Sequence, residues 1–148
     1  MERYSCKTEI IAGTGSVSRL AELGAKRLLL VTDPYFQKDG TARRVAQAAQ
    51  TPAVEIFDRV IPDPTVELAA AGAARVKEFQ PDLIVALGGG SAMDCAKAMA
   101  YFGGGNYRLA AIPTTSGSGS EVTDFAILTH NGIKHPLVDE KLRPDLAI

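Results

Sequence analysis

Three consecutive glycines between an apolar segment and a helix-forming segment constrain this chain more than any other feature. Residues 83–87 (Leu-Ile-Val-Ala-Leu) lack polar alternation, which is typical of a parallel strand covered on both faces. Gly88-Gly89-Gly90-Ser91 follows directly, and a helix is predicted over residues 91–102. Glycines let a ligand approach the backbone, and the start of a helix offers unpaired N–H groups. The segment therefore predicts a pyrophosphate-binding turn, although a plain turn capped by Ser91 would also explain it.

Apolar segments alternate with helical segments along most of the chain. Strands are predicted at residues 28–31, 54–57, 83–87 and 109–112, and helices at residues 39–50, 65–79 and 91–102. This alternation in 148 residues predicts one α/β domain, a Rossmann-like, doubly wound and mostly parallel sheet.

Two segments depart from that alternation. Residues 4–11 are expected to form an extended lead-in strand. Residues 125–129 and 133–138 flank Asn131-Gly132, which predicts an added β-hairpin. Pro136 lies in the second arm and indicates an edge strand, because proline cannot donate to a ladder.

A second polar loop follows the strand at residues 109–112. Five hydroxyl side chains and two glycines occur within residues 114–121 (Thr-Thr-Ser-Gly-Ser-Gly-Ser-Glu). Ligands of open α/β sheets bind at the carboxyl ends of the strands, where this loop and the glycine turn are both expected. We therefore expect the two loops to share one ligand, although a flexible surface loop would explain this segment taken alone.

Asp33 follows the strand at residues 28–31 and precedes Pro34. A carboxylate at that place can accept hydrogen bonds from the adenosine ribose hydroxyls and repel a 2′-phosphate, which favours NAD over NADP. The alternative is an Asp that starts a turn before proline. The glycine spacing does not match Gly-x-Gly-x-x-Gly, so the standard dinucleotide fingerprint is not met.

Composition excludes several other classes of function. The formal net charge is -1, which gives no field for binding nucleic acid or an anionic membrane. No apolar run is long enough to span a bilayer, and the first residues lack the core of a secretion signal. Two cysteines are too few for a disulfide framework. We expect a cytoplasmic protein with neither a nucleic-acid nor a membrane partner.

The remaining candidate residues have simple structural interpretations. His130 and His135 lack a metal-ligand spacing with other residues and are expected to lie exposed on the hairpin. Cys6 and Cys95 are interpreted as small apolar residues, the former within the lead-in strand. Asp94 and Lys97 are three residues apart on a helix, which favours a surface ion pair.

Several long segments resemble one enzyme family. They are residues 88–97 (Gly-Gly-Gly-Ser-Ala-Met-Asp-Cys-Ala-Lys), 112–123 and 62–65 (Pro-Asp-Pro-Thr), continued by 132–137 and 143–148. Together they resemble the iron-containing (group III) alcohol dehydrogenases, over essentially the whole chain and in order. Within that family the likeness is strongest to the propanol dehydrogenase branch of propanediol-utilisation microcompartments. The resemblance implies a dehydroquinate-synthase-like N-terminal fold, NAD as cofactor, and a location in the cytoplasm or inside a bacterial microcompartment.

The resemblance also implies roles for particular residues. The positions implied to contact the cofactor are Asp33 at the adenosine ribose, Gly89, Gly90 and Ser91 at the pyrophosphate, Thr114, Thr115 and Ser118 along the cofactor, Asp94 toward the nicotinamide, and Lys134 at the nucleotide. Asp63 completes the set, at a position where the family often has Asn and the propanol dehydrogenase branch shares the carboxylate.

Length separates this chain from the family. Family members are more than twice as long, and an all-helical C-terminal domain supplies one Asp and three His to iron or zinc. We expect residues 1–148 to be the NAD-binding domain, without that metal-binding domain and without catalytic or metal-ligating residues of their own. Such a domain would bind NAD(H) but not oxidise a small alcohol or reduce an aldehyde by itself.

Two alternatives remain open. One is a non-catalytic interaction fragment, whose uncovered apolar face would favour association with other copies or proteins. The other is a domain of a glycerol dehydrogenase or dehydroquinate-synthase-like enzyme, which has a similar glycine turn.

Overall fold

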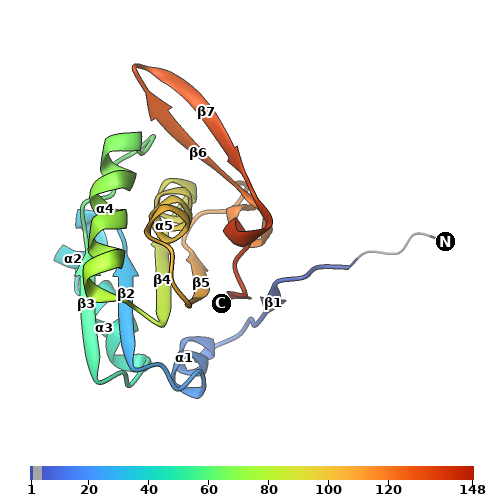
Figure 1. The fold of residues 1–148 in the computed structure, drawn as a ribbon. Helices are drawn as coiled ribbons and strands as arrows, with labels where there is room; N and C mark the ends of the chain where they lie inside the picture. Colours follow the sequence, from blue (N-terminus) through green and yellow to red (C-terminus); the bar gives the residue numbers. More distant parts are fainter. Residues whose placement is uncertain (2–4) are drawn as a thin grey trace.

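The computed structural model describes Met1 and residues 5–148, and its centre is a parallel sheet (Figure 1). The strand order is β1-β8-β5-β4-β2-β3, and every neighbouring pair is parallel. The strands are β1 (Glu9–Ile10), β2 (Arg27–Val31), β3 (Ala53–Phe57), β4 (Leu83–Gly88), β5 (Arg108–Pro113) and β8 (Leu146–Ala147). The α-helices are α1 (Arg19–Glu22), α2 (Pro34–Lys38), α3 (Thr41–Ala48), α4 (Val66–Phe79) and α5 (Gly90–Gly103). The 3-10 helices are η1 (Ser16–Ser18), η2 (Ser120–Val122) and η3 (Glu140–Leu142). The predicted α/β class is confirmed.

Two apolar layers cover the sheet because successive side chains of a strand point to opposite faces. Leu29 and Ile84 pack on one face with residues of α4 and α5, including Val76 and Met99. Leu28, Leu30 and Val85 pack on the other face with residues of α3. The central strands are buried on both sides, which explains why their sequences lack polar alternation.

The strand order changes direction between β2 and β4. After β2 the chain crosses to β3 on one side, and after β4 it crosses to β5 on the other. The carboxyl ends of β2 and β4 therefore lie at a topological switch point, where open α/β sheets bind their ligands. Asp33 follows β2 here and Gly88 ends β4, so the fold places two predicted site segments together.

A separate antiparallel hairpin stands above the sheet at this end (Figure 1). Its arms are β6 (Phe125–His130) and β7 (Ile133–Val138). Asn131 and Gly132 both have positive φ, 48° and 74°, as the predicted two-residue turn requires. Pro136 faces Ile127 on the outer strand β7, so the predicted edge position is confirmed.

The structure corrects several element predictions. Of the lead-in strand only Glu9–Ile10 is extended in a ladder, Tyr4 lies outside the described residues, and Cys6 is exposed before the strand. The helix predicted at residues 39–50 is the shorter α3, and a separate helix, α2, precedes it. The two helices are separate because Gly40 between them has a left-handed backbone conformation, with φ 82°. Strand β8 was not predicted, since two residues carry no periodicity. No helix among the described residues has the length and hydropathy needed to cross a bilayer.

Candidate cofactor-binding site

Close contacts at the glycine turn exclude a side chain at Gly88 and leave little room for one at Gly89 and Gly90. Gly88 has φ 147°, and a Cβ there would lie 2.7 Å from Ala92 Cβ, so only glycine fits. A Cβ at Gly89 would lie 3.1 Å from Thr115 Oγ1, and one at Gly90 would lie 3.1 Å from Ser118 Cβ. Helix α5 begins at Gly90, and its first N–H groups have no acceptors within the helix. The expected approach of the two loops is therefore present.

The second loop presents polar side chains beside this turn. Thr114 N donates to Gly88 O at 3.0 Å, which joins the ends of β5 and β4. Thr114, Thr115 and Ser118 are exposed, so their hydroxyls are accessible to a ligand. The predicted loop thus lines one side of the glycine turn, with Thr115 beside Gly89 and Ser118 beside Gly90.

Asp33 combines the two interpretations of its sequence position. One carboxylate oxygen caps α2, because Oδ1 accepts from Tyr35 N at 2.9 Å and Phe36 N at 3.2 Å. The other oxygen, Oδ2, lies 3.7 Å from the place of a Cβ at Gly88. Asp33 is therefore a helix cap whose second oxygen faces the glycine turn.

Three further predicted residues come together where the hairpin meets the start of α5. Asp63 N donates to Ser91 Oγ at 3.3 Å. Lys134 Nζ lies 2.8 Å from Asp63 Oδ1, and both side chains are more than half exposed. Asp63 has φ 52°, a region that Asp tolerates better than most residues. The Pro62–Thr65 loop is thereby tied to both α5 and β7.

Asp94 and Lys97 do not form the surface ion pair that their spacing favours. Lys97 is 1% exposed, and its Nζ donates to the backbone oxygens of Thr123 and Phe125, at 2.9 Å each. Asp94 instead accepts from Ser120 Oγ at 2.8 Å and Ile127 N at 3.1 Å. Helix α5 is apolar on nearly every side, and that was the signal for a buried lysine.

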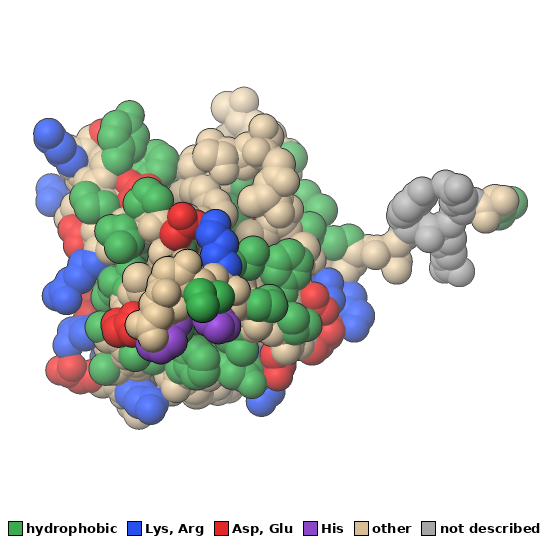
Figure 2. All heavy atoms as spheres, turned by 90° about the horizontal axis from the view of Figure 1, so that it is seen from above, with side chains coloured by type: hydrophobic (Ala, Val, Ile, Leu, Met, Phe, Trp, Pro, Cys, Tyr) green, Lys and Arg blue, Asp and Glu red, His purple; other side chains and the backbone are tan. Residues whose placement is uncertain are grey.

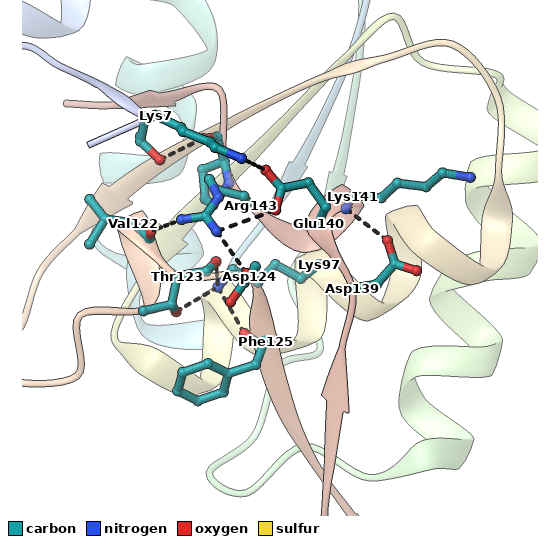
Figure 3. Close-up of polar contacts among 12 residues, drawn as sticks. Lys7, Lys97, Val122, Thr123, Asp124, Phe125, Asp139, Glu140, Lys141 and Arg143 are labelled. Carbon is teal, nitrogen blue, oxygen red and sulfur yellow. Dashed lines mark hydrogen bonds and ion pairs between the residues drawn. The ribbon is translucent and has the colours of Figure 1, made fainter. Parts of the chain in front are cut away.

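Charged side chains lie near Lys97, and Figure 3 shows Asp124 and Arg143 on the segment beside it. Burial lowers the pKa of Lys97 to about 8, while the carboxylates of Asp94, Asp124 and Glu121 favour its charged form. Arg143, which sequence reasoning also missed, donates to Asp124 Oδ2 at 2.7 Å and to Val122 O at 3.2 Å. Two cations therefore hold residues 122–125, at the start of β6.

The remaining candidates carry no further chemistry. His130 and His135 are exposed, with ring centroids 6.4 Å apart, and Figure 2, seen from above, shows the two histidine side chains next to each other. His130 Nδ1 also lies 3.1 Å from Glu67 Oε1. Among the described residues, no three His, Cys, Asp or Glu side chains are grouped to hold a metal ion. Cys95 is fully buried, as expected, and burial raises the pKa of its thiol to about 12. Cys6, interpreted as a small apolar residue of the lead-in strand, is exposed and lies before β1, so its place in the strand is wrong.

A doubly wound parallel sheet with a glycine turn at its switch point places this chain among the open α/β domains, which bind their ligands at that point. The model of the iron-containing alcohol dehydrogenase family matches residues 7–148. The chain therefore belongs to that family, and the resemblance of its motifs is confirmed.

Relatives with established names agree with this placement. The 1-propanol dehydrogenases PduQ of Citrobacter freundii and Salmonella typhimurium are 35% and 36% identical to this chain. Each likeness extends over 100% of this chain and 42% of the dehydrogenase. The structure of sulfoacetaldehyde reductase from Bifidobacterium kashiwanohense, solved with NAD+, has a TM-score of 0.88 at 30% identity. That likeness covers 99% of this chain and 45% of the reductase. The chain thus spans less than half the length of these relatives.

Proposed function

We propose that residues 1–148 are the NAD(H)-binding domain of an iron-containing alcohol dehydrogenase that interconverts a small alcohol and an aldehyde. The observation that carries this proposal is the glycine turn at the switch point, faced by Thr115 and Ser118. The neighbour solved with NAD+ supports the same cofactor here. When bound, NAD supplies the nicotinamide carbon that accepts or releases hydride.

Different residues of the proposed site would contact different parts of the cofactor. The N–H groups of Gly90 and Ser91, at the positive end of α5, would bind the pyrophosphate. The hydroxyls of Thr114, Thr115 and Ser118 would donate from the opposite side. Lys134 would place a positive charge near the nucleotide while it pairs with Asp63, and Asp94 would lie toward the nicotinamide.

Asp33 would decide between the two nicotinamide cofactors. Its Oδ2 faces the glycine turn and can accept from ribose hydroxyls, and its charge repels a 2′-phosphate. A family relative is an NADPH-dependent butanol dehydrogenase, 33% identical over 44% of its own length, so the preference is a property to measure in each member. We propose NAD for this chain.

The described residues do not fit the family's metal site, and we assign no step to a metal here. We propose that the domain binds its cofactor without turning over alcohol by itself. A location in the cytoplasm or in a bacterial microcompartment is part of the same proposal and rests on the likeness to the 1-propanol dehydrogenases.

Titration of NADH and NADPH into the purified chain, followed by NADH fluorescence and by heat, tests the proposal. The informative variant is Asp33→Ser, because Ser keeps an acceptor that caps α2 but removes the oxygen facing the turn. The matched control is Glu22→Ala, which removes a carboxylate on α1, before β2 and away from the carboxyl ends of the strands.

We expect the wild-type chain to bind NADH more tightly than NADPH. Asp33→Ser should weaken NADH binding about tenfold and reduce the preference for NADH, because one lost contact of a charged group has that size. Glu22→Ala should leave both affinities unchanged. Absence of NADH binding to the wild-type chain, or equal behaviour of the two variants, would overturn the proposal.

A further inference from the structure

Among the residues that the structure describes, no strand covers the edge of β6 that faces away from β7. In an antiparallel pair, alternate residues point their N–H and C=O groups away from the partner strand. Asp139 N donates to Asp124 O, so residues 125, 127 and 129 are the ones whose backbone groups point away from β7. An uncovered edge of this kind is open to pairing with other chains unless its groups are satisfied.

Side chains of α5 bind two of the backbone groups at that edge. Phe125 O accepts from Lys97 Nζ at 2.9 Å, and Ile127 N donates to Asp94 Oδ2 at 3.1 Å. The next outward N–H, that of Thr129, donates to Pro64 O at 2.9 Å. The hairpin is therefore attached to α5 and to the loop before α4 in one defined register.

Lys97 is the central group of this attachment. Its ammonium lies between Thr123 and Phe125, as Figure 3 shows, and it also reaches Thr123 Oγ1 at 3.3 Å. A buried ammonium must keep its acceptors close because losing them would leave a charge without water or partners. The start of β6 is thus held at one distance from α5.

The position of the hairpin decides where two cofactor-site segments lie. Lys134 on β7 pairs with Asp63, which in turn donates to Ser91 at the start of α5. The loop of Thr115 and Ser118 leads directly into the segment that Lys97 holds. Any shift of that segment would therefore move Lys134 and the hydroxyl loop relative to the glycine turn.

We propose that Lys97 is a positioning residue that sets hairpin β6–β7 over the start of α5 and thereby places Lys134 and the 114–121 loop around the cofactor. This role rests on the proposed binding of NAD(H). Lys97 Nζ donates to Thr123 and Phe125, and it would act through the segments that carry these residues.

The test combines amide hydrogen exchange with NADH titration on Lys97→Met, which keeps the length of the side chain and removes its donors. The control is Val76→Ala, which loosens the apolar layer between α4 and α5 without a contact to the hairpin. Lys97→Gln, with a neutral donor, provides a second variant if Lys97→Met does not fold.

We expect exchange of residues 122–138 to become about tenfold faster in Lys97→Met, while amides of β2 and β4 keep their protection. NADH binding should weaken about tenfold, and Lys97→Gln should be intermediate in both measurements. Val76→Ala should lower thermal stability without this local change.

Three results would overturn the inference. One is unchanged exchange of the hairpin in both Lys97 variants, and another is uniformly faster exchange, as expected for general destabilisation. A looser hairpin with unchanged NADH affinity would show that the position of the hairpin does not affect cofactor binding. If the wild-type chain binds no NADH, the proposed function fails, while the exchange pattern still decides whether Lys97 holds the hairpin.

Discussion

The sheet and the hairpin are attached to the molecule by different forces. Every residue of β4 is buried, and the apolar residues of β2 are fully covered on both faces. In β7 five of the six residues are exposed, and β6 alternates between covered and open positions. Leu128 packs the inner face of the hairpin against Ala69 of α4 and Ala98 of α5. The edge of the hairpin is held by Lys97, Asp94 and Pro64.

This difference separates stability from placement. Burial of apolar area is non-directional, so it stabilises the sheet without specifying one orientation of an added hairpin. Hydrogen bonds to particular backbone groups are directional and specify the register. We infer that substitutions in the sheet mainly change the free energy of unfolding, whereas substitutions at the hairpin junction mainly change where the hairpin lies.

The largest effect is expected from the sheet. Leu30→Ala removes a fully buried side chain from β2 and should lower the free energy of unfolding by about 2–5 kcal/mol. Ile133→Ala on β7, where Ile133 is 62% exposed, should change it by less than about 0.5 kcal/mol. Urea unfolding of both variants measures the contrast. Similar losses would mean that the hairpin contributes to the core as the sheet does.

The next effect concerns the buried charge at the hairpin junction. The pKa of Lys97 is lowered from 10.5 to about 8 on folding, so between those pH values the unfolded chain binds the proton more strongly. Lys97 should therefore make the fold more stable as pH rises through this interval. The difference in unfolding free energy between wild type and Lys97→Met should increase by about 3 kcal/mol across it.

Comparison with Lys97→Met isolates this titration from the rest of the chain. Asp94, Glu121, Asp124 and Arg143 surround Lys97 and are present in both proteins. Denaturant unfolding at pH 7.5, 9 and 10.5 gives the required values. A difference independent of pH would contradict the burial of the ammonium group.

A smaller effect is expected at the helix cap beside the hairpin. Thr65 Oγ1 accepts from Leu68 N at 3.1 Å and caps α4, and Thr65 also bridges to Thr129 of β6. Thr65→Ala should lower the free energy of unfolding by about 1 kcal/mol, which thermal unfolding measures. Thr65→Ser keeps the capping oxygen and should recover most of the loss. Equal losses in the two variants would assign the effect to the lost methyl group.

The smallest effect on stability is expected from the exposed ion pair. Lys134→Met removes the contact to Asp63, and both side chains are more than half exposed. The unfolding free energy should change by less than about 0.5 kcal/mol. NADH binding should nevertheless weaken severalfold, since the proposed site loses a positive charge. A large loss of stability would show that this pair, rather than Lys97, holds the hairpin.

Much of the fold could be predicted because its signals are local. Continuous apolar runs identified β2 and β4, three glycines identified the turn, and Asn131-Gly132 identified the hairpin. Strand β8 has only two residues, and its place between β1 and β5 depends on pairing with distant segments. A pattern of residues contains no information of that kind.

The sequence by itself determined the α/β class and the glycine turn, because apolar periodicity and glycine content are properties of neighbouring residues. The predicted cofactor contacts came from the resemblance of its motifs to one family and stay predictions. Tertiary structure alone decided the role of Lys97. Its acceptors are backbone oxygens 26 and 28 residues away, which every residue carries, so no side-chain pattern could reveal them. Burial then turned a lysine expected at the surface into the group that holds the hairpin.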